Sequence, residues 1–314
     1  MQNIVFSATI VAPVFLIIFL GLFLKYRGII DERFNAVTSK MVFNVAMPAL
    51  LFQKLSSIPI EEIFNPWQLL YIIGALCFMF ALAWAISLFI CNNGADQGTF
   101  IQGSFRGNFA ILGLALVYNA FGSEALAHGA LVLAVIMPLY NVLSIIALTV
   151  PLHREKSLTP RHTFIKILTN PLILAAVVSL PFSIFQIPVH SIVTQTIDYL
   201  AGMTLPLALI GIGSSLSFTS VRQDRALTLA ATITKIIVMP LVCTTGAVLA
   251  GFRGQTLGIM YFLFAAPTAI ASYIMAYALG SNGRLAGNIV LVSTMVSMVT
   301  IAVGIFILKS LAFF

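Results

Sequence analysis

Ten long runs of apolar residues, separated by short polar clusters, dominate the chain. Each run is close to the roughly 20 residues that an α-helix needs to cross a bilayer, and about twice the length of a barrel strand. A helix also satisfies its own backbone hydrogen bonds in lipid. The pattern predicts an all-α integral membrane protein with about ten transmembrane helices, at residues 4–24, 36–54, 67–90, 100–120, 124–150, 164–186, 192–216, 226–250, 256–279 and 284–310.

Short patterns recur along the chain at a shift of 158 residues. Two of the matches contain prolines in equivalent runs, which chance alone explains poorly. The matched segments are Ala12-Pro13 with Asn170-Pro171, Met47–Leu50 with Leu205–Ala208, and Gly122-Ser123 with Gly280-Ser281. Because each half would hold five helices, an odd number, the second half would enter the membrane with opposite orientation. The chain is therefore predicted to form two inverted five-helix repeats, residues 1–155 and 156–314, as in many secondary transporters.

Composition and charge agree with a membrane protein. Hydrophobic residues make up 60% of the chain and charged residues 8%, against roughly 25% charged residues in soluble domains. Basic residues near helix ends lie in odd-numbered loops, eleven against three, which predicts cytoplasmic odd loops and both termini outside. The net charge of +7 includes no dense basic run, so no nucleic-acid partner is expected. Cys77, Cys91 and Cys243 lack metal-ligand spacing, so no metal site is expected.

Prolines and glycines interrupt several of the predicted spans. An interrupted helix exposes half-helix ends, whose N-termini favour anions and whose C-terminal carbonyls favour cations. A kink that merely packs against a neighbour would explain one such span, but interruptions in matched spans of both halves favour a binding site. The expected helix breaks are Pro48, Gly107, Gly113, Pro206 and Pro267, with the fourth and ninth helices discontinuous near their middle.

Two basic residues lie inside predicted spans. Lys235 is near the middle of the eighth span, where an ionisable side chain costs roughly 2.5–3.5 kcal/mol to insert and is a functional candidate by default. It is expected to act as countercharge for an anionic substrate or as a protonation site, the alternatives being a structural ion pair or snorkelling. Arg106 lies closer to a cytoplasmic end, so substrate contact and snorkelling to the headgroups stay equally open for it.

Neutral polar residues near the expected breaks complete the candidate substrate site. They are Asn44, Asn108, Asn141, Thr268 and Ser272. The alternative for Asn44 and Asn141 is a hydrogen bond between helices, which is favoured slightly for Asn141 and disfavoured slightly for Asn44. Asp198, near the outer start of the seventh span, is interpreted as a solvated helix end rather than a cation site.

Five segments together resemble the auxin efflux carrier family of membrane transporters, in its short bacterial form, over essentially the whole chain. They are Asn44–Leu50, Gly107–Leu114, Thr204–Gly211, Lys235–Pro240 and Ala266–Ala269. The resemblance implies two inverted five-helix repeats whose broken fourth and ninth helices cross at the substrate site. It also implies carrier-type movement of organic anions, indole-acetate in plant members and small carboxylates in bacterial ones. Ala115 stands where the family usually has a proline, which puts the usual crossover in question.

The expected function is a secondary transporter, an efflux carrier of small organic anions such as mono- or dicarboxylates, that works by alternating access in the plasma (inner) membrane. A channel-like anion pore is the alternative. An intramembrane enzyme is disfavoured, because the spans lack a His-Glu-x-x-His motif, paired aspartates or a Ser–His arrangement. No cofactor is expected, and coupling to protons or sodium is undetermined. The expected partners are the anion, membrane lipid and a second copy of the chain in a homodimer.

Overall fold

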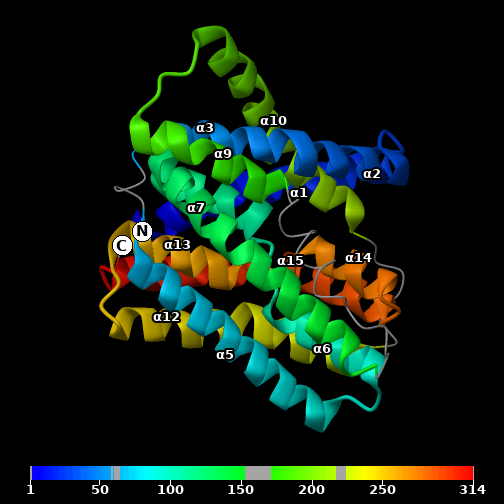
Figure 1. The fold of residues 1–314 in the computed structure, drawn as a ribbon. Helices are drawn as coiled ribbons and strands as arrows, with labels where there is room; N and C mark the ends of the chain where they lie inside the picture. Colours follow the sequence, from blue (N-terminus) through cyan, green and yellow to red (C-terminus); the bar gives the residue numbers. More distant parts are fainter. Residues whose placement is uncertain (1, 58, 60–63, 153–170, 217–223, 314) are drawn as a thin grey trace.

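The computed structural model describes residues 2–57, 59, 64–152, 171–216 and 224–313, and these residues are helical with short connections. Three single turns of π-helix, labelled η, lie between α-helices. In chain order the elements are α1 (Gln2–Tyr26), α2 (Glu32–Met41), η1 (Val42–Ala46), α3 (Met47–Ser56), α5 (Pro66–Ile90), α6 (Gly94–Phe105), η2 (Phe109–Gly113), α7 (Leu114–Thr149), α9 (Pro171–Phe185), α10 (Ser191–Ser215), α11 (Arg225–Ile233), η3 (Thr234–Val238), α12 (Met239–Leu249), α13 (Gly254–Ala265), α14 (Ile270–Ala278) and α15 (Gly283–Ser310) (Figure 1).

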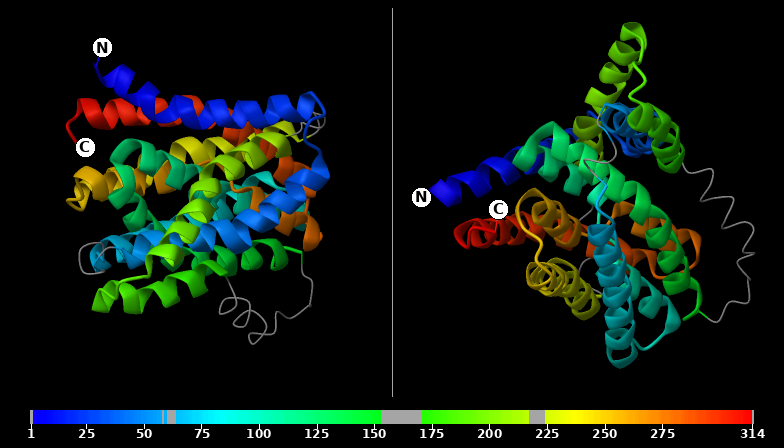
Figure 2. Two further views of the ribbon diagram at one scale, coloured as in Figure 1. Left: turned by 90° about the horizontal axis from the view of Figure 1, so that it is seen from above. Right: turned by 60° about the vertical axis from the view of Figure 1, so that its left-hand side comes forward.

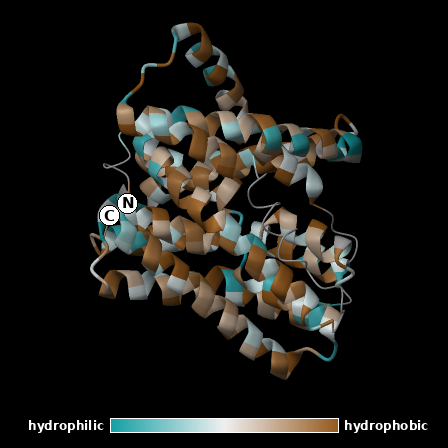
Figure 3. Cartoon of the chain, viewed as in Figure 1, coloured by the Kyte–Doolittle hydropathy of each residue, from teal (hydrophilic) through white to brown (hydrophobic). Residues whose placement is uncertain are grey.

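The outer surface of the bundle is apolar. Large hydrophobic side chains such as Trp67, Phe78 and Phe89 on α5 are exposed, while Ile72 and Leu76 on the same helix are buried. A helix that is apolar on all sides lies in a large core or in a membrane, and Figure 3 shows hydrophobic residues along most of the helices. Within the described residues, six helical segments are long and apolar enough to cross a membrane. The chain is therefore an integral membrane protein.

The two ends of the chain lie side by side. Asn3 in α1 donates a side-chain hydrogen bond of 3.0 Å to the Ser310 hydroxyl at the end of α15, and Figure 2 shows the two helices adjacent to each other. On another side, α1 packs against α10 so closely that Gly213 abuts the backbone of Ile18. The start of α1 and the end of α15 thus mark one end of the bundle, called here the terminal end.

Two helices stop near the middle of the bundle, and they approach it from opposite ends. The start of α13 is at the terminal end, since the Gly254 N–H donates to the Phe313 carbonyl at 2.8 Å. The start of α6 is at the other end, since Asp96 accepts a 2.7 Å hydrogen bond from Asn282, just before α15. Because α15 runs the whole length of the bundle between these two contacts, α6 and α13 meet beside it at their C-terminal ends.

The interruptions of the two helices pair with each other. Gly107 and Thr268 form an antiparallel bridge, the Asn108 N–H donates to the Pro267 carbonyl at 2.7 Å, and the Ala269 N–H donates to the Arg106 carbonyl at 3.1 Å. Backbone groups without partners cost several kcal/mol in a membrane, and each segment satisfies the groups that the other has freed. The expected breaks at Gly107 and Pro267 are thus present, and the segments cross although Ala115 is not a proline.

Three other expected breaks are wrong. Pro206 lies inside the continuous helix α10, where it removes only the hydrogen bond to the carbonyl four residues earlier. Pro48 lies in the first turn of α3 directly after the π-turn η1, whose wider winding removes the proline's conflict with the preceding turn. Gly113 has helical φ and ψ of −61° and −47° and leads straight into α7. Of the five expected breaks, only the two whose segments pair with each other, at Gly107 and Pro267, therefore interrupt their helices.

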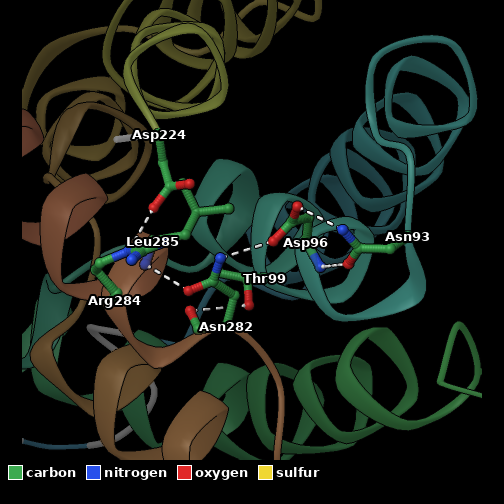
Figure 4. A network of polar contacts seen from close by, with 7 residues as sticks. All are labelled: Asn93, Asp96, Thr99, Asp224, Asn282, Arg284 and Leu285. Carbon is green, nitrogen blue, oxygen red and sulfur yellow. Dashed lines mark hydrogen bonds and ion pairs between the residues drawn. The ribbon is translucent and has the colours of Figure 1, made fainter. Parts of the chain in front are cut away.

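A network of polar side chains ties three helix starts together at the end of the bundle opposite the termini (Figure 4). The Asp96 carboxylate in α6 accepts hydrogen bonds of 2.7 Å from the amides of Asn93 and Asn282. Asn282 in turn accepts the Leu285 N–H at the start of α15, and Arg284 pairs with Asp224 before α11 at 2.9 Å. The network holds α6, α11 and α15 in fixed relative positions.

The boundary expected between the two repeats, 155/156, lies outside the described residues. So do five of the basic residues that predict the orientation, namely Arg154, Lys156, Arg161, Lys166 and Arg222. The described part does give two matched glycines a positive φ. Gly122, which interrupts α7, has φ of 81°, and Gly280, which follows α14, has φ of 76°.

Candidate functional site

A cavity of about 380 Å³ lies beside the crossing of the two interrupted segments. Its volume falls within the roughly 300–1,000 Å³ of small-molecule sites. The walls come from η1, the α6–η2 connection, the second part of α7, α10 and the start of α14. Four of the residues expected at the site line this cavity: Asn44, Arg106, Asn108 and Asn141.

Arg106 supplies a buried positive charge to the cavity. Its side chain is 5% exposed, because it ends α6 inside the bundle rather than at its surface. One guanidinium nitrogen, Nη1, donates to the Ser144 hydroxyl at 2.9 Å, and Nη2 donates to the Asn141 side-chain oxygen at 3.0 Å. Both partners are neutral, and no carboxylate of the described residues lies within ion-pair distance of Arg106. Snorkelling, the alternative for Arg106, is therefore wrong. Because its partners are neutral, the guanidinium of Arg106 keeps a net charge that an anion can pair with.

Two half-helix N-termini also face the cavity. The helix formed by η2 and α7 begins at Phe109 and α14 begins at Ile270, and both residues line the cavity walls. The first backbone N–H groups of a helix have no acceptor inside it, and the helix dipole places a partial positive charge there. Asn108, at the first of these starts, is 7% exposed and makes no side-chain capping bond. Its amide is thus free to bind a ligand.

The charged residues that line the cavity are cationic. Besides Arg106 they include Lys40, at the end of α2, and none of the lining residues carries a carboxylate. Asn44 donates its side-chain amide to the Lys40 carbonyl at 2.9 Å, which leaves its oxygen directed away from that bond. A buried guanidinium, a lysine and two helix N-termini around one volume favour a bound anion and disfavour a cation.

Lys235 does not line this cavity. Its side chain is fully buried, and Nζ donates to the Phe264 carbonyl at 2.8 Å and contacts the Met239 sulfur at 3.2 Å. Gly107 separates it from the cavity, since a Cβ at Gly107 would lie 3.2 Å from Nζ. Phe264 is in the last turn of α13, where carbonyls lack partners and a cation is favoured. In this structure Lys235 therefore lies outside the cavity lining, in the position of a helix C-cap, and its contact with a substrate stays a prediction.

Thr268 and Ser272 likewise lie outside the cavity lining. The Thr268 hydroxyl donates to the Gly103 carbonyl at 2.7 Å, and its backbone N–H donates to the Ser293 hydroxyl at 3.1 Å. Thr268 therefore joins α6 and α15 at the crossing. The Ser272 hydroxyl is buried and has no hydrogen-bond partner among the described residues.

The sequence interpretation missed three side chains around Arg106. Ser144 and Tyr140 lie on the same face of α7 as Asn141, and Met275 of α14 contacts Arg106 Nη1 through its sulfur at 3.0 Å. Residues three or four apart share a helix face, so the spacing of Tyr140, Asn141 and Ser144 could have revealed one polar stripe. No sequence signal marks Met275, because it reaches the site only through the fold of α14.

The fold and the site define a helical membrane protein with a buried cationic cavity at the crossing of two broken helices. The chain belongs to the membrane transport protein family, whose model matches residues 6–305. This match confirms the resemblance to auxin efflux carriers, and the chain is a membrane transporter.

Similar proteins come from archaea and from a bacterium. The chain is 22% identical to an "Uncharacterized transporter" of Methanothermobacter thermautotrophicus over 302 residues, covering 94% of this chain and 96% of the other. It is 24% identical to a transporter of Methanocaldococcus jannaschii, covering 93% and 96%. It is 25% identical to a Rhizobium meliloti protein named "Putative malonate transporter" over 310 residues, covering 96% and 95%.

Proposed function

We propose that this transporter carries small organic anions, mono- or dicarboxylates, out of the cell across the plasma (inner) membrane by alternating access. The observation that carries the proposal is the placement of Arg106, whose buried guanidinium lines a 380 Å³ cavity with only neutral partners among the described residues. A planar guanidinium binds a carboxylate through two parallel hydrogen bonds.

Two further observations support an anion. The starts of η2 and α14 contribute backbone N–H groups on the cavity wall, each helix end being equivalent to roughly half a positive charge. In addition, a relative that aligns with 96% of this chain at 25% identity is named for malonate, a dicarboxylate. A dicarboxylate would occupy Arg106 with one carboxylate and the helix starts or Lys40 with the other.

The proposed architecture is ten transmembrane helices in two inverted repeats, residues 1–155 and 156–314, with both termini outside. Three features support it. The interrupted helices α6 and α13 enter from opposite ends, the matched residues Gly122 and Gly280 both have positive φ, and the chain starts and finishes at the same end of the bundle. In such carriers one part of the molecule moves relative to the other around a fixed site.

The test is counterflow of labelled malonate, malate and indole-acetate into liposomes that contain the purified protein. We expect saturable uptake by the natural protein. In Arg106→Gln, KM for the anion should rise by about 10- to 100-fold, because a charge-assisted hydrogen bond contributes about 1.5–3 kcal/mol. Arg225→Gln, the same change at an exposed position outside the cavity, is the control and should stay within about twofold.

Three outcomes contradict the proposal. Saturable uptake of organic cations with no uptake of anions would reverse the sign of the site. An unchanged KM in Arg106→Gln would remove the guanidinium from substrate binding. Large unitary currents in planar bilayers would favour the channel instead of the carrier.

A further inference from the structure

A second cavity, of about 370 Å³, lies toward the terminal end of the bundle. It is enclosed by α1, α3, α7 and α10 and shares no lining residue with the first cavity. On α3 it is lined by Gln53 and Lys54, near the helix end, and on α10 by Asp198. Both helices also wall the first cavity further along their length, as does α7.

The two cavities are separated by a thin apolar layer. Met47 lines the first cavity and Leu50 the second, three residues further along the same helix, which is a rise of about 4.5 Å. On α10, Ala208 faces the first cavity and Leu209 the second. Each of these four side chains is at most 5% exposed. The cavities are therefore about one helical turn apart along α3 and lie on different faces of α10.

Polar groups line the second cavity although most of its wall is apolar. Pro206 lines it together with Gly202, whose carbonyl loses its usual helical donor to the proline. The Asn119 amide donates to the Ile10 carbonyl at 3.1 Å. Freed carbonyls at membrane depth are tolerated where they face protein or a water-filled cavity. The position of Pro206, which is not a helix break, thus indicates that water enters here.

Lys54 is the cation of this cavity. Its ammonium group donates to the Ser123 hydroxyl at 2.8 Å, a neutral partner, and it forms no ion pair with any carboxylate of the described residues. The carboxylate of Asp198 is engaged instead by the Gln53 amide. The lining contains one lysine and one aspartate, so its net charge is near zero, whereas two cations line the first cavity. An anion would be held here more weakly, as a site of passage requires.

We propose that the second cavity is a transit site for the transported anion, where Lys54 binds the carboxylate at the outer side of the thin layer and Asp198 keeps the affinity low. The proposal rests on the proposed function, since it concerns the same anion and the same path. According to this proposal, Lys54 strengthens anion binding in the second cavity and Asp198 weakens it. A purely structural role for either residue would not produce such opposite effects.

The test uses a cysteine placed in the second cavity. Cys77, Cys91 and Cys243 are replaced by serine, and Tyr118→Cys, a half-exposed lining position, is labelled from outside by a membrane-impermeant maleimide with and without malonate. We expect malonate to slow labelling about threefold or more. Lys54→Gln should abolish this protection, Lys54→Arg should restore it, and Asp198→Asn should lower the malonate concentration for half protection by about threefold or more. Ser57→Cys, exposed at the end of α3 but outside the cavity lining, is the control and should show no protection.

Transport measured on the same variants separates the possible failures. Malonate transport without protection of Tyr118→Cys, or equal protection in Lys54→Gln, would overturn the transit site and leave the proposed function intact. Labelling of Tyr118→Cys only from the cytoplasmic side would place the second cavity on the inner side of the apolar layer, which would also overturn the transit site. If malonate is not transported, and also does not slow the labelling of Tyr118→Cys when Lys54 and Asp198 are unchanged, both proposals fail. Thermal unfolding of each variant shows whether the protein is still folded.

Discussion

The backbone N–H of Asn108 donates to the carbonyl of Pro267 at 2.7 Å, across 159 positions of sequence. This bond joins the two interrupted helices at their crossing, and the side chains on its two sides have different surroundings. Arg106 and the helix starts face the cavity, while Lys235 lies behind Gly107 at the end of α13. We therefore predict separable roles for the two buried cations of the crossing.

Replacing Lys235 by methionine should change the rate of transport more than substrate affinity. The substitution leaves the Phe264 carbonyl without its donor but does not alter the lining of the cavity. We expect KM for malonate within about twofold of the natural protein and Vmax lower by about tenfold, corresponding to about 1.4 kcal/mol. Counterflow kinetics in liposomes measure both. A KM increase as large as that of Arg106→Gln would show instead that Lys235 contacts the anion.

The contact between α1 and α10 should tolerate no added side-chain atom at Gly213. A Cβ there would overlap the Ile18 carbonyl oxygen, a backbone atom that cannot move away cheaply. Gly213→Ala should therefore destabilise the protein by about 2–3 kcal/mol. The same substitution at Gly202 in the same helix meets no atom within 4 Å and should stabilise by about 0.5–1 kcal/mol. Thermal unfolding in detergent distinguishes the two, and equal shifts would contradict the close packing.

The network around Asp96 should depend on its carboxylate. Two amide groups, from Asn93 and Asn282, donate to its oxygens, so Asp96→Asn turns one of these bonds into a contact between two donors. We expect a loss of about 1–2 kcal/mol in stability. Asp31→Asn is the matched control, because Asp31 accepts a backbone N–H from Phe34 and asparagine caps as well as aspartate. Equal stability of both variants would show that the network does not hold α6 to α15.

Cys91, just beyond the end of α5, should react slowly with maleimides at neutral pH. Burial, and then the nearby Asp96 carboxylate, raise the pKa of its thiol to about 11. Because the thiolate is the reactive form, its labelling rate should rise about tenfold per pH unit from pH 7 to about 10. In a protein with Cys77→Ser and Cys243→Ser, maleimide labelling quenched at a series of times measures this rate. A rate that levels off near pH 9, as for an ordinary thiol, would contradict the raised pKa.

The helical segments were predictable because a helix in lipid closes its hydrogen bonds locally. Residues 67–90 and 192–216 were expected as spans, and α5 (Pro66–Ile90) and α10 (Ser191–Ser215) begin and end within one residue of them. The interruptions at Gly107 and Pro267 were also predictable, because glycine destabilises a helix interior through its conformational freedom and proline lacks the backbone N–H that a helix needs. Pro48 and Pro206 carried the same local signal, yet their helices continue, because a π-turn in one case and a single missing bond in the other suffice.

The amino-acid sequence by itself therefore determined the membrane class, the helical character of the chain and the family, all of which depend on composition and on short local patterns. It also favoured Lys235 over Arg106 for the site, on depth in the membrane alone. Only the tertiary structure decided which of the two lines the cavity, because the side that a residue faces depends on which helices pack around it. Arg106 faces the cavity through Asn141 and Ser144, and Lys235 faces the end of α13, contacts between segments that no local pattern specifies.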